Sequence, residues 1–310
     1  MSAWLIVVIV ICSLLVFFGL THYLVIYLIF HKFFTRQPNE RIIEIGYKNL
    51  TQEQDEYLKN TIQELESFPH HEVSIHSKDN KKLVGDYYPA SSDKLFIFFH
   101  GFQSNSYMNL SLQALHFLKK GYNILLLDQR THHRSEGKYI TYGFYEHEDV
   151  LSWIEYADKL EEINEIILHG ISMGGTSIAL ASEYIISNKV KHLVIEDAYT
   201  NLEKLADDIA ETQKIPFYIF KKELGFCIRH IAKADWRKID TVESLKINKI
   251  HTVFIRSEKD AIVNESFFND NYNNCGCLKD KFIVPNAKHA WGAITSAEIY
   301  FKQLDKFLGE

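Results

Sequence analysis

The sequence of 310 residues contains only four cysteines and five prolines, and its Lys and Arg residues are scattered. Cys275 and Cys277 are separated by one residue, a spacing that fits neither a common disulfide nor a zinc knuckle. We therefore expect free thiols and a reducing compartment. The net charge of −6 without basic clusters argues against nucleic acid as a partner. His-x-x-x-His pairs and glycine-rich phosphate loops are also missing, so the sequence predicts no metal and no cofactor.

Charge is absent altogether from one segment, residues 3–30, which is rich in Leu, Ile, Val and Phe. As a helix this segment would be roughly 40 Å long and would cross the ~30 Å hydrocarbon core of a membrane. Because no basic residue precedes it, we expect an uncleaved transmembrane anchor over residues 1–31 rather than a signal peptide. Lys32, Arg36 and Arg41 follow the segment, so the positive-inside rule predicts a cytoplasmic C-terminal domain.

After the anchor, residues 32–70 are polar and charged, and we interpret them as a linker with a lead-in helix. From residue 71 to 310, short apolar runs alternate with helix-length amphipathic stretches, which predicts an α/β domain. Continuous apolar strands favour a mostly parallel sheet covered by helices on both faces. The expected strands are residues 72–76 and 82–88, as an antiparallel pair, then 95–99, 123–127, 165–168, 192–195, 252–255 and 281–284.

The alternation stops over residues 200–248, which contain helical patterns and the aromatic run 215–220 but no apolar strand. Helices packed on the edge of the sheet would explain this interval. A helical cap that offers apolar surface to a substrate would explain it equally well. Since ligands of such sheets bind beyond the carboxyl ends of the strands, the functional residues are expected there.

A Gly-x-Ser-x-Gly pattern, Gly170-Ile-Ser172-Met-Gly174, follows the expected strand 165–168 and precedes a helical pattern over residues 176–186. In that context the pattern predicts a nucleophile elbow, in which the serine sits on a tight turn between strand and helix. A serine hydroxyl is a weak nucleophile near neutral pH. It therefore needs a neighbouring base, usually histidine, that is oriented by a carboxylate.

Later strand ends supply both groups: Asp260 follows the strand 252–255, and His289 follows the strand 281–284. Two rival acids remain open, Asp197 after the strand 192–195 and Glu258 two residues before Asp260. The other histidines near strand ends are interpreted as structural or polar residues, with His100 shaping a loop: His100, His132, His133 and His169.

Four blocks of sequence resemble the α/β-hydrolase superfamily, and more narrowly its membrane-anchored bacterial branch of serine-aminopeptidase-like or lysophospholipase-like hydrolases. These blocks are Phe99-His100-Gly101-Phe102, Asp128 to Gly137, the elbow around Ser172, and the two strand ends with Asp260 and His289. The resemblance implies Ser172 as nucleophile, Asp260 as orienting acid and His289 as general base. It also implies an oxyanion hole made by the backbone N–H groups of Phe102 and Met173. The sequence departs from the family pattern in three turns, at Thr131, Ser257 and Asn264.

These observations predict a serine hydrolase that cleaves a carboxylic ester, thioester or amide through an acyl-enzyme on Ser172. The anchor and the aromatic cap favour an apolar, lipid-like acyl substrate. A membrane-tethered binding protein with the same fold and no catalysis is the alternative. A dehalogenase or epoxide hydrolase would need an aspartate at the elbow, and Ser172 argues against both.

Overall fold

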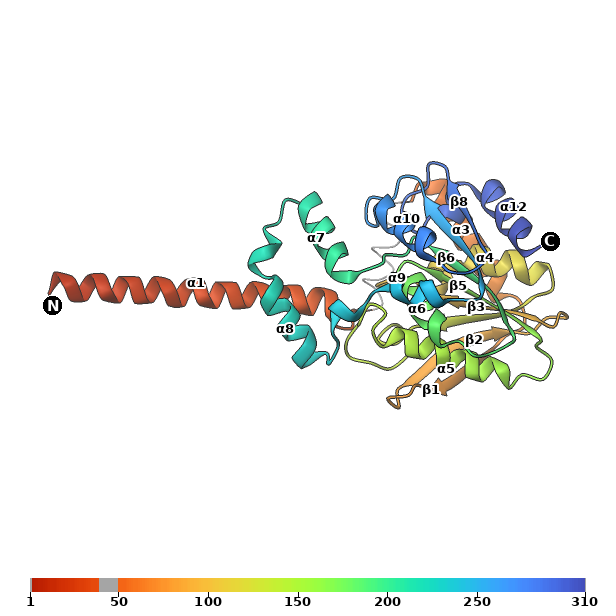
Figure 1. The fold of residues 1–310 in the computed structure, drawn as a ribbon, viewed down its shortest axis with the longest axis horizontal. Helices are drawn as coiled ribbons and strands as arrows, with labels where there is room; N and C mark the ends of the chain where they lie inside the picture. Colours follow the sequence, from red (N-terminus) through yellow and green to blue (C-terminus); the bar gives the residue numbers. More distant parts are fainter. Residues whose placement is uncertain (1, 39–49, 310) are drawn as a thin grey trace.

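The computed structural model describes residues 2–38 and 50–309, and an eight-stranded sheet forms its centre (Figure 1). The strand order is β1-β2-β4-β3-β5-β6-β7-β8; β2 pairs antiparallel with β1 and β4, and all other pairs are parallel. The predicted α/β fold with a mostly parallel sheet and an antiparallel first pair is therefore confirmed. The strands are β1 (His71–His76), β2 (Lys82–Tyr88), β3 (Lys94–Phe99), β4 (Asn123–Asp128), β5 (Glu165–Ile171), β6 (Val190–Glu196), β7 (His251–Ser257) and β8 (Lys279–Val284).

Alternate residues of the central strands enter two separate apolar clusters, because side chains of a strand point to opposite faces. In β3, Phe96 and Phe98 pack under the helices α3 (Gln52–Glu66), α4 (Ser106–Lys119) and α12 (Ala297–Leu308). Leu95 and Ile97 pack under α5, α6, α9 and α10 on the other face. The bounds of these four helices are Glu146–Asp158, Met173–Ala181, Thr241–Ile247 and Glu265–Asn274.

A third apolar cluster lies at the end of the molecule from which α1 (Ala3–Phe34) projects (Figure 1). It joins the last turns of α1 to the elements α7 (Leu202–Thr212), η2 (Phe217–Ile219), α8 (Lys221–Ile231) and η3 (Trp236–Lys238). We call these four elements the cap. The helix α9, which lies within the interval expected for the cap, instead packs on α6 and α10. Two short segments, η1 (Ser182–Tyr184) and α11 (Gly292–Thr295), also occur within the described residues.

The helix α1 continues to Phe34, three residues beyond the expected end of the anchor at residue 31. Residues 35–38 then run along the domain, where Thr35 forms an antiparallel bridge with Tyr139. Of the expected linker, residues 39–49 lie outside the described residues, and α3 is the expected lead-in helix. A capping box between Thr51 and Gln54 fixes the start of α3.

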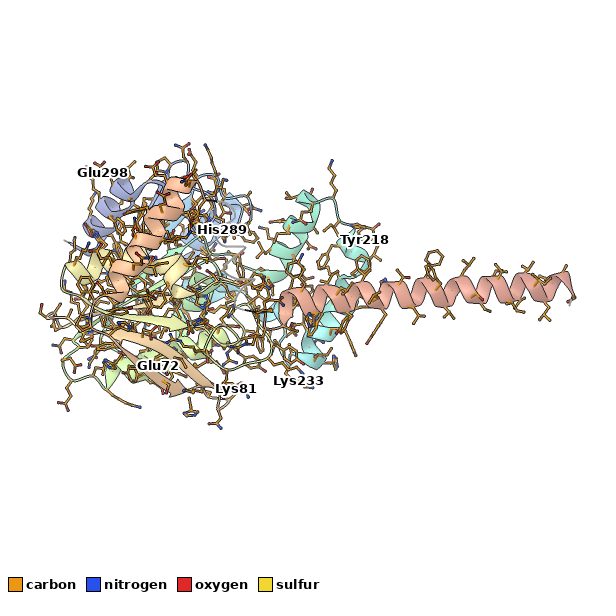
Figure 2. The ribbon with its side chains drawn as sticks, turned by 180° about the vertical axis from the view of Figure 1, so that it is seen from behind. Glu72, Lys81, Tyr218, Lys233, His289 and Glu298 are labelled. Carbon is orange, nitrogen blue, oxygen red and sulfur yellow. The ribbon has the colours of Figure 1, made fainter. Side chains whose placement is uncertain are left out.

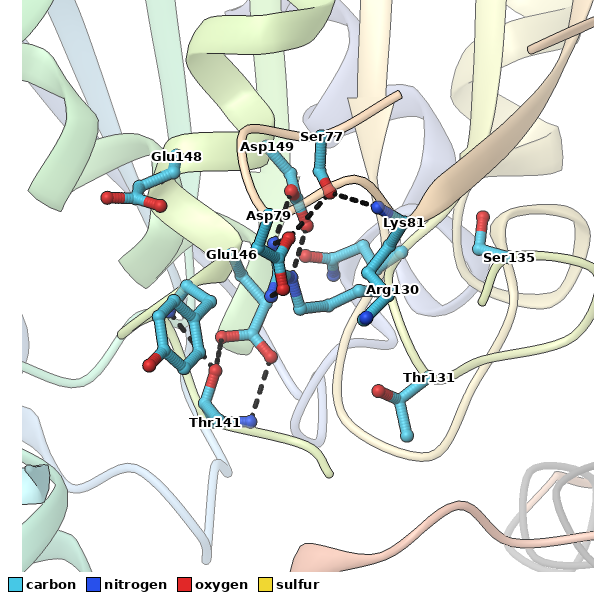
Figure 3. A network of polar contacts seen from close by, with 12 residues as sticks. Ser77, Asp79, Lys81, Arg130, Thr131, Ser135, Thr141, Glu146, Glu148 and Asp149 are labelled. Atoms are coloured by element: carbon cyan, nitrogen blue, oxygen red, sulfur yellow. Dashed lines mark hydrogen bonds and ion pairs between the residues drawn. The ribbon is translucent and has the colours of Figure 1, made fainter. Parts of the chain in front are cut away.

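The loop after β4, in which Tyr139 pairs with Thr35, is held by ion pairs and hydrogen bonds (Figure 3). The Arg130 guanidinium donates two hydrogen bonds of 2.6 Å to the Asp149 carboxylate and also pairs with Asp79 at 3.2 Å. The Glu146 carboxylate accepts from both the N–H (2.9 Å) and the hydroxyl (2.6 Å) of Thr141. Bidentate pairs of this kind are geometrically specific. They hold the loop after β4 against α5.

Candidate active site

Ser172 stands on the turn between β5 and α6, with φ = 54°, a backbone region that non-glycine residues rarely adopt. The strain of such a turn is compensated by its hydrogen bonds: the Ser172 N–H donates to the Glu196 carbonyl at 2.8 Å, and Thr176 N–H donates to the Ser172 carbonyl at 2.9 Å. A side chain on Gly174 would overlap the Phe99 carbonyl, and one on Gly170 would overlap the backbone of Gly174. The two glycines of the pattern are therefore required by the close approach of three backbone segments.

The predicted serine, histidine and aspartate lie in one chain of hydrogen bonds. The His289 Nε2 atom is 2.9 Å from Ser172 Oγ, and its Nδ1 atom is 2.6 Å from Asp260 Oδ2. The second Asp260 oxygen accepts from the N–H groups of Ile262 (2.8 Å) and Val263 (2.9 Å), which fixes the carboxylate. Burial lowers the pKa of His289, but the Asp260 carboxylate raises it, and the net pKa lies above its ordinary value.

Asp197, the rival acid, is also brought to this site but makes different contacts. Its carboxylate accepts from the Ser257 N–H and hydroxyl, both at 2.7 Å, and from the Ala290 N–H at 2.9 Å. Burial and the neighbouring Asp260 carboxylate raise the pKa of Asp197. Glu258 lies on the surface, where it accepts from the Asn286 N–H at 2.7 Å.

Asp197, Asp260 and His289 each offer a potential metal-ligand atom, and these atoms lie within 4.8 Å of one another. Their hydrogen bonds favour another use. Both oxygens of each carboxylate already accept hydrogen bonds from the protein, and the Nδ1 atom of His289 faces Asp260 rather than open space. Such an arrangement suits proton transfer at Ser172 more than the binding of a cation.

The loop after β3 places Phe102 opposite the elbow. Across residues 2–38 and 50–309, the backbone N–H groups of Phe102 and Met173 donate to no protein acceptor. Met173 is the first residue of α6, where the N–H has no helical partner and lies at the positive end of the helix dipole. Gly101 beside Phe102 is held by its N–H, which donates to Asn109 Oδ1 at 2.9 Å.

Two buried histidines hold the same loop. His100 Nε2 accepts from the Gln129 N–H at 3.0 Å, and His132 Nε2 accepts from the Gln103 N–H at 3.1 Å. Burial lowers the pKa of His100 to about 3 and also lowers the pKa of His132, so both rings are neutral near pH 7 and can accept. The structural role expected for His100 agrees with these contacts. The role of His132, the residue that positions Gln103, was not predicted from the sequence.

A cavity of about 540 Å³ opens at Ser172 and His289, a volume typical of small-molecule sites. Its walls are mainly apolar and aromatic. Tyr142 and Tyr199 contribute rings, and Leu205 comes from α7 of the cap. Phe33, in the last turn of α1, lines the same cavity, although sequence reasoning had placed it in the linker. Figure 2 shows His289 in the body of the domain, on the side of the cap.

Comparisons with known proteins bear on the fold that carries this site. A model of the alpha/beta hydrolase fold family matches residues 94–225. The uncharacterized protein YqkD of Bacillus subtilis is 25% identical over 224 residues, which cover 71% of this chain and 72% of that protein.

Solved structures share the fold at lower sequence identity. The Pyrococcus furiosus esterase Pf2001 gives a TM-score of 0.66 at 23% identity and covers 80% of this chain and 92% of its own. Est1E from Butyrivibrio proteoclasticus, solved with ferulic acid bound, gives a TM-score of 0.59 at 17% identity and covers 76% of this chain and 97% of its own. The chain therefore has the α/β-hydrolase fold that the sequence predicts, and the match of residues 94–225 to that family indicates a hydrolase, which is also the enzyme class predicted from the sequence.

Proposed function

We propose that the protein is a serine hydrolase that cleaves a carboxylic ester through an acyl-enzyme on Ser172. The observation that carries the proposal is the hydrogen-bonded chain from Ser172 through His289 to Asp260 at the mouth of an apolar cavity. An ester is preferred over a thioester or amide because the similar structure Pf2001 is named an esterase.

The first half of the reaction follows from these contacts. His289 Nε2 takes the proton of the Ser172 hydroxyl as Oγ attacks the carbonyl carbon of the ester. The N–H groups of Phe102 and Met173 then hold the developing oxyanion, and each such donor typically contributes about 3 to 4 kcal/mol of transition-state stabilisation. Collapse of the tetrahedral intermediate breaks the ester C–O bond. The leaving alkoxide takes the proton from His289, and the acyl group stays on Ser172.

The second half repeats the proton transfers with water. His289 removes a proton from a water molecule, which attacks the acyl-enzyme carbonyl, and the Ser172 oxygen leaves with that proton. Asp260 keeps the imidazole in the tautomer with hydrogen on Nδ1 and stabilises the imidazolium that forms in each half. The products are a carboxylic acid and an alcohol.

We also infer that α1 is retained as a membrane anchor. Its most apolar window has a mean hydropathy of 3.0, so the helix is apolar and long enough to cross a membrane. A signal sequence would pass the same test. However, Ile26, Phe30 and Phe34 are buried, and the two phenylalanines pack with the cap and Tyr142. Removal of the whole apolar segment as a signal peptide would expose that cluster. The predicted cytoplasmic side still rests on the basic residues after the anchor.

Labelling with a fluorophosphonate probe tests the nucleophile. We expect the wild-type protein to be labelled and Ser172→Ala to remain unlabelled, with turnover of p-nitrophenyl butyrate reduced at least about 10⁴-fold. Ser104→Ala is a matched control, because Ser104 lines the same cavity but directs its hydroxyl to the Asn105 carbonyl at 3.5 Å. Equal labelling of Ser172→Ala would refute the assignment. Labelling without any turnover would favour the alternative of a tethered binding protein.

A further inference from the structure

The last turn of α1 is joined to the loops of the active site. The Tyr142 hydroxyl donates to the Phe33 carbonyl at 2.8 Å, and the Gln103 side-chain amide donates to the Lys32 carbonyl at 2.9 Å. Carbonyls in the last turn of a helix lack helical partners, so these bonds satisfy them. Gln103 directly follows Phe102, whose N–H is assigned to the oxyanion hole. The anchor helix is therefore part of the catalytic domain rather than a separate tether.

Contacts between α1 and the cap begin at His22. The His22 ring stacks on Phe220, with 5.2 Å between ring centroids, and Ile26 and Phe30 further along the helix are buried. By contrast, every residue from 3 to 21 is exposed, although the segment is apolar on all faces. These nineteen residues span about 28 Å as a helix, close to the ~30 Å hydrocarbon core of a bilayer.

This match places the membrane surface near His22, at the level where the cap starts. Two exposed tyrosines follow at that level, Tyr23 and Tyr27, and tyrosine is enriched at membrane–water interfaces. The cap carries its own exposed apolar residues there, in the loop between α7 and α8: Ile215, Tyr218 and Ile219 are 45%, 79% and 44% exposed. Figure 2 shows Tyr218 on the side of the cap that faces the projecting part of α1.

The helix α7 leads from that loop to the cavity, which Leu205 and Ile209 of this helix line together with Phe33. Phe33 lies eleven residues beyond His22, about 17 Å along the helix axis. One leaflet of the hydrocarbon core is about 15 Å thick, which is the reach of a lipid acyl chain. An acyl chain that starts between Phe33 and α7 and runs toward the membrane therefore reaches about the level of the exposed loop between α7 and α8.

The geometry points to a bilayer contact: the cap loop, residues 213–220, rests on the membrane, and the cavity takes its substrate from the membrane along α7 and the end of α1. The substrate class is an ester of a membrane-resident lipid whose single acyl chain occupies the cavity. This inference rests on the proposed hydrolase function. Continuity of the cap loop with the apolar surface of α1 identifies the bilayer, rather than a partner protein, as its occupant.

The test uses the full-length protein in phosphatidylcholine vesicles with two fluorogenic esters of 4-methylumbelliferone. The palmitate ester partitions into the vesicles, and the butyrate ester stays in water. We expect the double variant Tyr218→Asp, Ile219→Asp to lose about tenfold in turnover of the palmitate, because two carboxylates oppose contact of the loop with the bilayer. Turnover of the butyrate should stay within twofold of the wild type, because neither side chain lines the cavity.

Ile186→Asp is the matched control. Ile186 is 98% exposed and precedes β6, at the sheet edge opposite to the one that carries Ser172. It should leave both activities unchanged. The inference is overturned if the double variant matches the wild type on palmitate, or if both esters lose activity equally, which would assign the loop to the cavity itself. Butyrate turnover that survives Ser172→Ala would instead refute the proposed function.

Discussion

The ends of the neighbouring strands β6 and β7 each bring a carboxylate beside His289, and the two carboxylates have different surroundings. Asp260, after β7, contacts the imidazole itself at 2.6 Å. Asp197, after β6, instead binds the Ser257 N–H and hydroxyl and the Ala290 N–H, so it joins the loops that carry Asp260 and His289. The same chemical group thus contacts the His289 imidazole at one strand end and connects two loops of the site at the other.

The contacts of Asp197 explain one departure from the family pattern, the serine at position 257. Ser257 is one of the three turn positions at which the sequence departs from the family pattern, and its hydroxyl donates to Asp197 Oδ2 at 2.7 Å. A second departure, Thr131, adopts φ = 68°, a conformation that is costly for a β-branched residue. Its N–H donates to the Glu136 carbonyl at 2.9 Å and its hydroxyl to the Tyr139 carbonyl at 2.9 Å, which holds the turn.

The largest effect is expected from Asp260→Asn. An amide facing His289 Nδ1 favours the wrong tautomer, in which Nε2 carries the hydrogen and cannot accept the proton of Ser172. We expect kcat for p-nitrophenyl butyrate to fall about 10⁴-fold, with the protein still folded by circular dichroism. A loss below tenfold would show that another carboxylate orients the base.

A smaller loss of activity but a larger loss of stability is expected from Asp197→Asn. The amide nitrogen cannot accept, so at least one of the three hydrogen bonds at this buried position is lost. Hydrogen bonds to charged groups contribute about 1.5 to 3 kcal/mol each. We expect kcat/KM to fall roughly tenfold and the melting temperature to drop by several degrees.

The single-bond control for that variant is Ser257→Ala, which removes only the hydroxyl contact and should have the smaller effect on both measurements. If Asp197→Asn lowers kcat by about 10⁴-fold and Asp260→Asn hardly changes it, Asp197 rather than Asp260 orients His289. Melting curves and steady-state kinetics of all three variants therefore test the comparison directly.

The smallest effect is expected on the pH dependence of kcat/KM. His289 must be neutral to accept the Ser172 proton, so activity falls as the pH drops below the pKa of His289. Burial lowers this pKa, Asp260 raises it, and the negative charge of Asp197 raises it further. Asp197→Asn removes one raising charge, so the acid limb of the kcat/KM profile should move to lower pH. Glu258→Gln, which removes an exposed carboxylate bound to the Asn286 N–H, should leave the limb in place. A shift to higher pH in Asp197→Asn would contradict this electrostatic account.

Much of the fold follows from local patterns. Apolar runs identified the six strands from β3 to β8, since buried parallel strands need apolar side chains on both faces, and β1 and β2 were predicted as an antiparallel pair. The elbow at Ser172 was predictable because a tight turn between a strand and a helix requires glycine on both sides of the serine. The end of α1 was not predictable to the same degree. Hydropathy reports only that a segment avoids water, and it does not distinguish contact with lipid from contact with Tyr142 or the cap.

The sequence alone predicted the mostly parallel sheet, a serine followed by an acid and a histidine at later strand ends, and the apolar N-terminal helix, because each strand, turn and helix involved is marked by a local pattern. The tertiary structure decided which carboxylate faces His289, since Asp197 and Asp260 both follow strands that end at the same edge of the sheet. It also extended α1 to Phe34 and so brought Phe33, which sequence reasoning places in the linker, into the cavity of Ser172. Contacts between residues far apart in the chain depend on packing, and no local pattern records them.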